Sequence, residues 1–255
     1  MTSKIEWTDE TWNPVTGCND DIISSGCTNC YARRMATRLK GRFGYPADDP
    51  FRVTFHPDRL EDPLHWKKPR RIFVCSMGDL FHEDVKTDDI YRIIVRMEEA
   101  KQHTFLILTK RPKRMLELMN NPKWFAANPN LWLGVTAENQ ARFNERWLIA
   151  QQIPAAKLFV SMEPLLGPIR FLWNARKPDL IIAGCESING KPGRKTEYHW
   201  LRDIKDQCVE AGIPFFLKQM AYHEWGKGYR IFKMPMLDGQ RWDQLPRKEN
   251  HGIHR

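Results

Sequence analysis

The sequence predicts an α/β fold built on parallel β-strands. Short, almost continuously apolar runs recur from residue 72 onward, and helical patterns separate them. Strands that are covered on both faces have this composition. Strands and helices that alternate at this spacing favour a parallel sheet with right-handed crossovers. The length of 255 residues is normal for a single α/β barrel. A closed barrel, a partial barrel and an open doubly wound sheet all fit the pattern.

Each predicted strand is a short run rich in β-branched or aromatic residues. There are six such runs, and a shorter one near the N-terminus brings the total to about seven: 72–77, 104–109, 131–136, 157–162, 180–184, 214–218 and 11–15. The segments 88–102, 139–151 and 199–211 have helical periodicity. Gly212 and Pro214 mark the end of the last helix.

Two segments depart from the alternation of strand and helix. Residues 31–71 form an insertion, with a helix at 31–42 and a short strand at 52–55. Beyond residue 220 the chain is less regular, and Asp238-Gly239 predicts a hairpin turn. We therefore predict a barrel unit over 1–220 and a C-terminal extension over 221–255.

The composition indicates a globular protein outside membranes. Hydrophobic residues make up 42% of the chain and charged residues 28%. No apolar run approaches the ~20 residues that span a bilayer, and the N-terminus lacks the apolar stretch of a signal peptide. We expect a cytoplasmic protein without a membrane partner. The net charge of +9 favours a polyanionic partner such as DNA or RNA, or simply a basic solvated surface. The sequence predicts no oligomeric state.

Three of the six cysteines form the chemical centre of the sequence. Cys18, Cys27 and Cys30 lie close together among small and polar residues. Thiolates bind soft metals, and the spacing of Cys27 and Cys30 lets both sulfurs face one site. The flexible span after Cys18 can fold back and bring the Cys18 sulfur to the same site as a third ligand. The other cysteines lie in apolar or helical segments and are predicted to be core residues: Cys75, Cys185 and Cys208.

The number of thiols is informative. A closed structural zinc site needs four ligands, whereas a four-iron cluster held by three thiolates leaves one iron open. In radical S-adenosylmethionine (SAM) enzymes that iron chelates SAM. An electron from the cluster then releases a 5′-deoxyadenosyl radical, which abstracts hydrogen from the substrate. A zinc site with a fourth ligand from His56, His65 or His82 remains an alternative, and so do unligated thiols.

Polar or small residues follow each predicted strand. In parallel α/β folds the functional site lies at this end of the sheet. The residues are Ser76, Gly78, Asp79, Thr109, Lys110, Arg111, Thr136, Glu138, Ser161, Glu163, Gly184, Glu186, Lys218 and Gln219.

Residues 7–18 and 26–32 resemble the opening of a phage-associated family of unknown function, commonly described as phage protein gp thirty-seven/sixty-eight. Further matches cover nearly the whole chain, at 76–82, 108–112, 134–139, 161–165, 182–187, 215–219 and 237–239. The family is similar to the radical SAM superfamily. The usual cysteine spacing there is Cys-x3-Cys-x2-Cys, whereas eight residues separate Cys18 from Cys27 here.

The resemblance implies a partial or near-complete parallel (β/α) barrel of radical SAM type. It implies a 4Fe-4S cluster on Cys18, Cys27 and Cys30, with SAM as the second cofactor. By analogy, the turn after the first complete βα strand binds SAM. The implied cofactor-binding residues are Ser76, Met77, Gly78, Asp79, Thr136, Glu138, Glu163 and Glu186. The implied catalytic residues are Glu163, Glu186, Lys110 and Lys218. Of these, Lys110 and Lys218 suit contact with an anionic group, as does Arg111.

The leading functional hypothesis is a radical SAM enzyme that modifies a nucleic-acid base or nucleoside. The phage resemblance and the positive charge favour this substrate, and a phage protein would act in the host cytoplasm. Such an enzyme needs an electron donor such as flavodoxin or ferredoxin. Two alternatives remain open: a radical SAM enzyme that acts on a peptide or small metabolite, and a non-catalytic nucleic-acid-binding protein stabilised by zinc or a cluster.

Overall fold

The computed structural model describes residues 5–120, 128–171 and 176–246. The α-helices are α1 (Tyr31–Leu39), α2 (Asp62–His65), α3 (Thr87–Glu99), α4 (Pro112–Met119), α6 (Gln140–Ala150) and α7 (Tyr198–Ala211), and the 3-10 helices are η1 (Ser25–Cys27) and η2 (Pro57–Arg59). The strands are β1 (Glu10–Trp12), β2 (Val15–Thr16), β3 (Thr54–Phe55), β4 (Arg71–Val74), β5 (Thr104–Thr109), β6 (Leu131–Thr136), β7 (Lys157–Met162), β8 (Leu180–Gly184), β9 (Ser187–Ile188), β10 (Lys191–Pro192), β11 (Phe215–Glu224), β12 (Gly228–Lys233), β13 (Met236–Leu237) and β14 (Gln240–Arg241).

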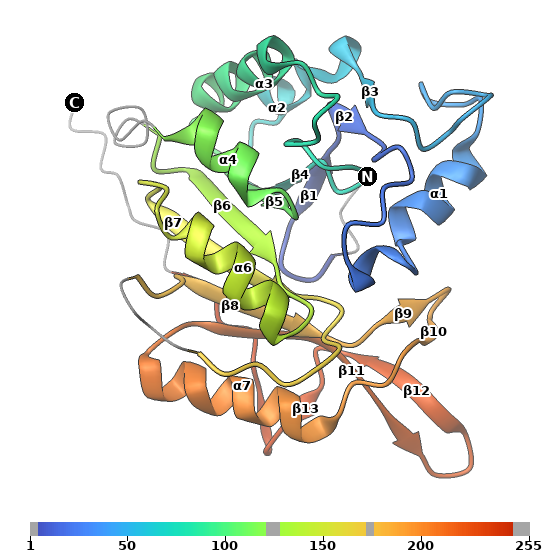
Figure 1. The fold of residues 1–255 in the computed structure, drawn as a ribbon, viewed down its shortest axis with the longest axis vertical. Coiled ribbons are helices and arrows are strands. Elements are labelled where there is room, and N and C mark those ends of the chain that lie inside the picture. The colour runs from blue at the N-terminus through green and yellow to red at the C-terminus, as the bar shows by residue number, and fades with distance from the viewer. Residues whose placement is uncertain (1–4, 121–127, 172–175, 247–255) are drawn as a thin grey trace.

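The centre of the fold is an 8-stranded sheet in the order β1-β4-β5-β6-β7-β8-β11-β12 (Figure 1). The strands from β1 to β11 are parallel, which confirms the predicted parallel α/β fold. The antiparallel strand β12 was not predicted. The order follows the chain without the reversal that marks a doubly wound sheet. Among the described strands β1 and β12 are the two edges, so the sheet does not close into a barrel.

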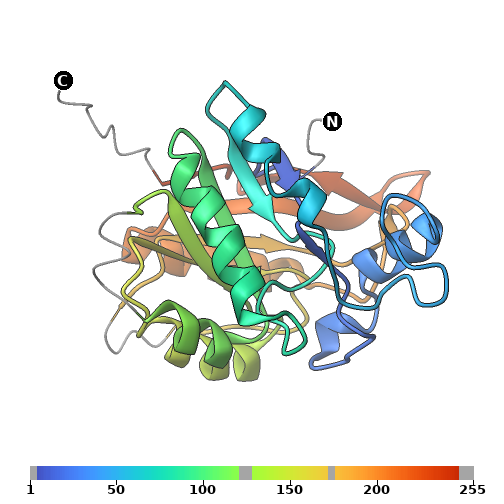
Figure 2. The same ribbon diagram turned by 90° about the horizontal axis from the view of Figure 1, so that it is seen from above.

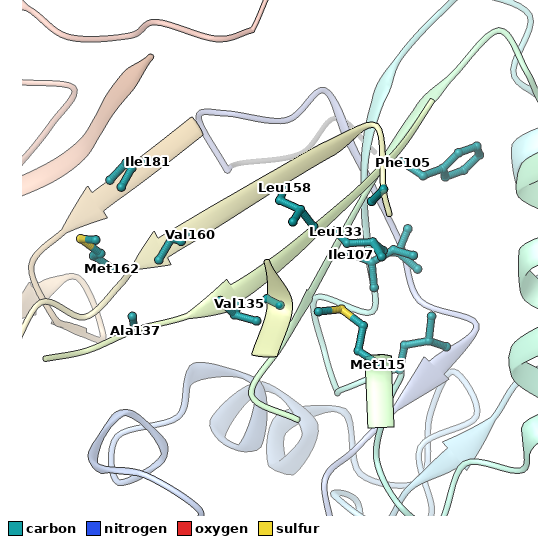
Figure 3. Packing of buried hydrophobic residues seen from close by; sticks show 14 of the residues in the cluster. Phe105, Ile107, Met115, Leu133, Val135, Ala137, Leu158, Val160, Met162 and Ile181 are labelled. Carbon is teal, nitrogen blue, oxygen red and sulfur yellow. The ribbon is translucent and has the colours of Figure 1, made fainter. Parts of the chain in front are cut away.

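The two faces of the sheet have separate cores. One face packs against the helices, and Ile107, Leu133 and Val160 point into this larger cluster (Figure 3). Figure 2 shows α3, α4 and α6 gathered over this side. The opposite face carries a smaller cluster around Trp7 and Phe159. Alternate residues of one strand enter opposite clusters because successive side chains in a strand point to opposite faces.

Four predicted strands are confirmed residue for residue as β5, β6, β7 and β8. The predicted strand 72–77 is too long, because β4 ends at Val74 and Cys75 has a φ of 55°. In the turn that follows, Asn13 Oδ1 accepts hydrogen bonds from the Met77 backbone N–H at 2.9 Å and from Ser76 Oγ at 3.1 Å. The final run is longer than predicted, because β11 continues to Glu224.

The three predicted helices between strands are confirmed as α3, α6 and α7. The side chain of Asn139 caps α6 by accepting from the Arg142 backbone N–H at 3.1 Å. Gly212, with a φ of 68°, ends α7 in the left-handed conformation that suits glycine. Within the described residues, no helix is long and apolar enough to cross a membrane.

The insertion and the tail each contribute to a separate two-stranded sheet. β3 pairs with β2, which places the insertion beside the first cysteine. In the tail, β13 and β14 form a hairpin whose turn residues Asp238 and Gly239 have φ of 53° and 76°. β11 runs across residue 220, and the division into 1–220 and 221–255 stays a prediction.

Candidate functional site

Two adjoining cavities lie at the carboxyl ends of the parallel strands. The smaller cavity has a volume of about 140 Å³ and is lined by Cys18, Cys27 and Cys30. The larger cavity has a volume of about 470 Å³ and is lined by Glu163 and Lys218, among others. The residues that line both cavities are Gly26, Cys30, Tyr31, Phe73, Leu108, Lys110 and Thr136. The two cavities are therefore continuous with one another.

The three cysteines come from a segment that we call the cysteine loop, residues 18–30. Cys27 closes η1 and Cys30 directly precedes α1. All three thiols are half-buried and free of disulfides. Gly17 is required just before the loop, because a Cβ there would lie 2.2 Å from the Arg52 carbonyl oxygen and its φ is 87°. Burial raises the pKa of the Cys18 thiol.

The donor set suits a cluster better than a single zinc ion. Sulfurs around a tetrahedral zinc ion lie about 3.8 Å apart, as follows from a Zn–S distance of about 2.3 Å. Among the described residues, no group of three ligand atoms within 4.8 Å of one another includes a cysteine. The volume of about 140 Å³ is roughly ten times what one water needs. Each thiolate of a four-iron cluster binds a different iron, so its sulfurs stand farther apart.

Two of the histidines proposed as a fourth zinc ligand, His56 and His82, lie in other contacts. His56 Nε2 is 2.8 Å from Thr16 Oγ1, and His65 ends α2. His82 belongs to a group with Asp21 and Glu83 that has the spacing of a metal site. The guanidinium of Arg111 already fills that group, because its Nε lies 2.6 Å from Glu83 Oε2 and its Nη2 lies 2.9 Å from Asp21 Oδ2.

Glu138 lies beneath the cysteine loop. Its Oε1 accepts a hydrogen bond from Ser24 Oγ at 2.6 Å, and Ser24 Oγ is also 3.8 Å from Cys27 Sγ. Its Oε2 pairs with Arg146 Nη1 at 3.1 Å. Burial opposes the charge of Glu138, but Lys110 and Arg146 hold the pKa of its carboxyl below the ordinary value. Both oxygens of this carboxylate are therefore engaged by the protein.

Glu186 holds the other part of the cysteine loop. Its Oε2 accepts hydrogen bonds from Asn29 Nδ2 at 3.1 Å and from Arg194 Nε at 3.0 Å. Arg194 Nη2 in turn donates to the Ser25 carbonyl oxygen at 2.9 Å. Asn29 lies between Cys27 and Cys30, so Glu186 acts on the turn that carries both sulfurs.

Asp79 connects the turn after β4 to the end of β5. Its Oδ1 accepts from Thr109 Oγ1 at 2.7 Å and from the Phe81 backbone N–H at 3.0 Å. Its Oδ2 accepts from the Lys110 backbone N–H at 3.2 Å and from Arg111 Nη1 at 3.3 Å. Asp79 lines the smaller cavity with its neighbours Ser76 and Gly78, whereas Met77 packs under α1 beside Cys18 and Cys30.

Glu163 and Lys218 form an ion pair on the wall of the larger cavity. Their Oε1 and Nζ atoms are 2.9 Å apart, and Ser161 Oγ donates to Glu163 Oε2 at 3.3 Å. Burial disfavours the charge of Lys218, but Glu163 keeps the pKa of the ammonium above its ordinary value. Gln219 Nε2 donates to the Cys185 carbonyl oxygen at 2.7 Å. This wall therefore presents a fixed cation and a fixed anion side by side.

Lys110 and Thr136 lie where the two cavities meet. In the described part of the chain, the Lys110 ammonium makes no ion pair or hydrogen bond, unlike the other charged groups of the site. Thr136 is buried, and its carbonyl oxygen accepts from Arg146 Nη1 at 2.7 Å.

Sequence reasoning missed the residues that fix the cysteine loop: Ser24, Asn29, Arg146 and Arg194. The first two lie within or beside the cysteine motif, so their polar side chains were a usable signal. Arg146 and Arg194 carried no such signal, because their partners are known only from the fold.

The sequence matches, over residues 2–246, the family described as "Protein of unknown function (DUF5131)". A search among curated proteins finds no match. The chain is similar to a mutant of spore photoproduct lyase, with a TM-score of 0.49 and 14% identity over 91% of this chain and 71% of that chain. For a mutant of that lyase with bound AdoMet and dinucleoside spore photoproduct, the TM-score is 0.44 and the identity 10%, over 88% of this chain and 68% of that chain. For spore photoproduct lyase complexed with dinucleoside spore photoproduct, the TM-score is 0.41 and the identity 10%, over 86% of this chain and 66% of that chain.

Proposed function

The chain belongs to the DUF5131 family, and we propose that it is a radical SAM enzyme with a 4Fe-4S cluster on Cys18, Cys27 and Cys30. One observation carries the proposal. Three free thiols line a cavity that opens into a larger, charged cavity at the carboxyl ends of parallel strands. In parallel α/β folds this is where ligands bind.

The two cavities divide the cofactors between them in this proposal. When bound, the cluster supplies an electron, and SAM supplies the 5′-deoxyadenosyl radical that removes hydrogen from the substrate. Lys110 would hold the SAM carboxylate, because this cationic residue lines both cavities. In the turn after β4, Ser76 and Gly78 border the smaller cavity, where the turn would meet the SAM amino group, and Thr136 would contact SAM from β6.

Three carboxylates that the sequence suggested as cofactor ligands act as positioning residues in this proposal. Glu138 and Glu186 hold the two halves of the cysteine loop, and Asp79 holds the turn beside it. Their oxygens already accept hydrogen bonds from protein groups. They keep the three sulfurs at a fixed separation, so that little ordering is needed when the cluster binds.

The substrate proposed is a nucleic-acid base or nucleoside. Five cationic residues line the larger cavity against three acidic ones: Lys110, Arg34, Arg38, Lys218 and Lys233 against Glu6, Glu163 and Glu186. Enzymes that act on a base read its edge with fixed donors and acceptors. The Lys218 ammonium and the Glu163 carboxylate supply one of each, 2.9 Å apart. The phage setting and an electron donor such as flavodoxin or ferredoxin stay predictions.

Iron and sulfide analysis after anaerobic reconstitution tests the proposal. We expect about four irons and four sulfides per chain. Cys18→Ala, Cys27→Ala and Cys30→Ala should each lose most of both. Cys208→Ala is the matched control, because Cys208 is buried in α7 and should leave the content unchanged. One zinc per chain without cluster uptake would overturn the proposal.

A further inference from the structure

β11 and β12 continue beyond the sheet as a two-stranded arm. β8 accompanies β11 only as far as Gln219. From there β11 pairs with β12 alone, up to Glu224 opposite Gly228. Figure 1 shows the arm at the end of the molecule, beside the β9–β10 hairpin, and β10 lies against β12. We call residues 220–232 the arm.

One face of the arm continues the wall of the larger cavity. Gln219 and Lys233 are cross-strand partners, and both line that cavity. Side chains on one face recur at every second residue. The same face therefore leads through Ala221 and Ile231 to the pair His223 and Tyr229. A ligand that leaves the larger cavity over Gln219 and Lys233 meets this face next.

The outer end of the arm exposes aromatic rings that no core explains. Trp225, in the turn, is 94% exposed, and Tyr229 is 44% exposed. The turn itself is ordered by hydrogen bonds, because the Lys227 backbone N–H donates to the Glu224 carbonyl oxygen at 3.0 Å. Gly226 and Gly228 have φ of 75° and 76°, which lets the chain reverse tightly. The structure thus presents Trp225 to solvent on a defined turn.

The charges around these rings suit a polyanion. The arm carries Lys227 and Arg230 but a single carboxylate, Glu224, and Lys233 follows the arm directly. Lys227 Nζ and Arg230 Nη1 pair with Glu224 at 2.8 and 3.0 Å. Exposed pairs of this kind contribute little to stability, so a phosphate can compete for both cations. Arg38 extends the positive rim on the α1 side of the larger cavity.

We propose that the arm binds single-stranded nucleic acid. Trp225 and Tyr229 stack on bases next to the one in the larger cavity. Lys227, in the turn, and Arg230, which is paired with Tyr222 on the opposite face of the arm, contact phosphates where the strand passes around the outer end of the arm. Aromatic rings beside cations on a groove that tracks the backbone are the usual means of binding single strands. The identity of the base in the cavity rests on the proposed function, but binding by the arm can be measured without turnover.

Fluorescence anisotropy of the full chain with a labelled oligothymidylate of about 15 nucleotides measures this binding, because that length covers about one site. Stacking of one base is worth ~1–3 kcal/mol, so Trp225→Ala should weaken binding about tenfold. Trp225→Phe should retain most of the affinity. Tyr91→Ala removes a ring that is 48% exposed on α3, and this control should stay within about twofold.

The charge contribution has its own variant and control. Lys227→Gln with Arg230→Gln should reduce the slope of log affinity against log salt by about 1.4, or about 0.7 per phosphate contact. Lys86→Gln with Arg92→Gln changes two cations at α3 and should leave the slope unchanged. An oligoribonucleotide of the same length distinguishes RNA from DNA as the preferred strand.

Three results would overturn the proposal: no binding by the unmodified chain, equal binding by Trp225→Ala, or a duplex that competes as well as the single strand. Reductive SAM cleavage measured without any oligonucleotide distinguishes a failure of nucleic-acid binding by the arm from a failure of the proposed function. The Trp225→Ala enzyme should cleave SAM normally, because Trp225 lies outside both cavities.

Discussion

Replacing Glu138 with Gln tests the contact that connects the cysteine loop to the helix layer. The Glu138 and Arg146 side chains are 0% and 2% exposed and 3.1 Å apart. Removing one charge from such a pair leaves the other buried without its counter-charge and costs about 3–5 kcal/mol. We therefore expect Glu138→Gln to lower the free energy of unfolding by about that amount, measured by urea denaturation.

A second variant, Ser24→Ala, tests whether the contact with Glu138 also supports cluster binding. Ser24→Ala removes the hydrogen bond to Glu138 Oε1 but leaves the pair with Arg146 intact. It should cost about 1.5–3 kcal/mol, as expected for one hydrogen bond to a charged group. We also expect it to lower the iron and sulfide content, since Ser24 lies beside Cys27. Glu145→Gln breaks an exposed pair with Arg142 on the same helix and should cost under about 0.5 kcal/mol. A loss below about 1 kcal/mol in Glu138→Gln, or full iron and sulfide content in both site variants, would refute this reasoning.

Three further predictions concern the same region. Gly26→Ala should abolish cluster uptake, because the added Cβ would lie 2.3 Å from Glu138 Oε1. The control Gly167→Ala should be tolerated, because its Cβ would lie 3.5 Å from the Asn139 side chain. Equal iron content in both variants would contradict the account. Lys110→Met should weaken SAM binding at least tenfold by calorimetry, in line with a lost charged contact of ~1.5–3 kcal/mol, whereas Lys113→Met on α4 should not. Burial lowers the pKa of His56 from 6.5 to about 4. The unfolded chain thus binds the proton first as the pH falls, and the stability contributed by neutral His56 is present above pH 6.5 and lost towards pH 4. His56→Gln should reduce the acid-induced loss of stability by about 2.5 kcal/mol between about pH 7.5 and about pH 4.5, and an unchanged pH profile would argue against a buried neutral His56.

The sheet was predictable because its strands are buried on both faces and so are continuously apolar. Runs such as 131–136 and 157–162 carry this signal without interruption, and they match β6 and β7. The signal failed where side chains from distant segments set the geometry. Asn13 shapes the turn after β4, so the apolar character of 75–77 did not extend the strand. β12 was missed because its half-exposed residues lack a continuous apolar run.

The candidate site was predictable as a place but not as a network. Polar residues at strand ends marked the edge of the sheet, and the cysteine spacing marked three thiols that line the smaller cavity. Which strand-end carboxylate holds which part of the cysteine loop depends on contacts across 114 and 157 residues, between Ser24 and Glu138 and between Asn29 and Glu186. Spacing within one segment contains no information about such pairs.

The most direct test of the central claim is reductive cleavage of SAM by the reconstituted chain. We predict that the reduced protein releases 5′-deoxyadenosine from SAM, and that Cys18→Ala, Cys27→Ala and Cys30→Ala each abolish release whereas Cys208→Ala does not. A fully reconstituted cluster that releases no 5′-deoxyadenosine, or release that persists without the three thiols, would contradict the account.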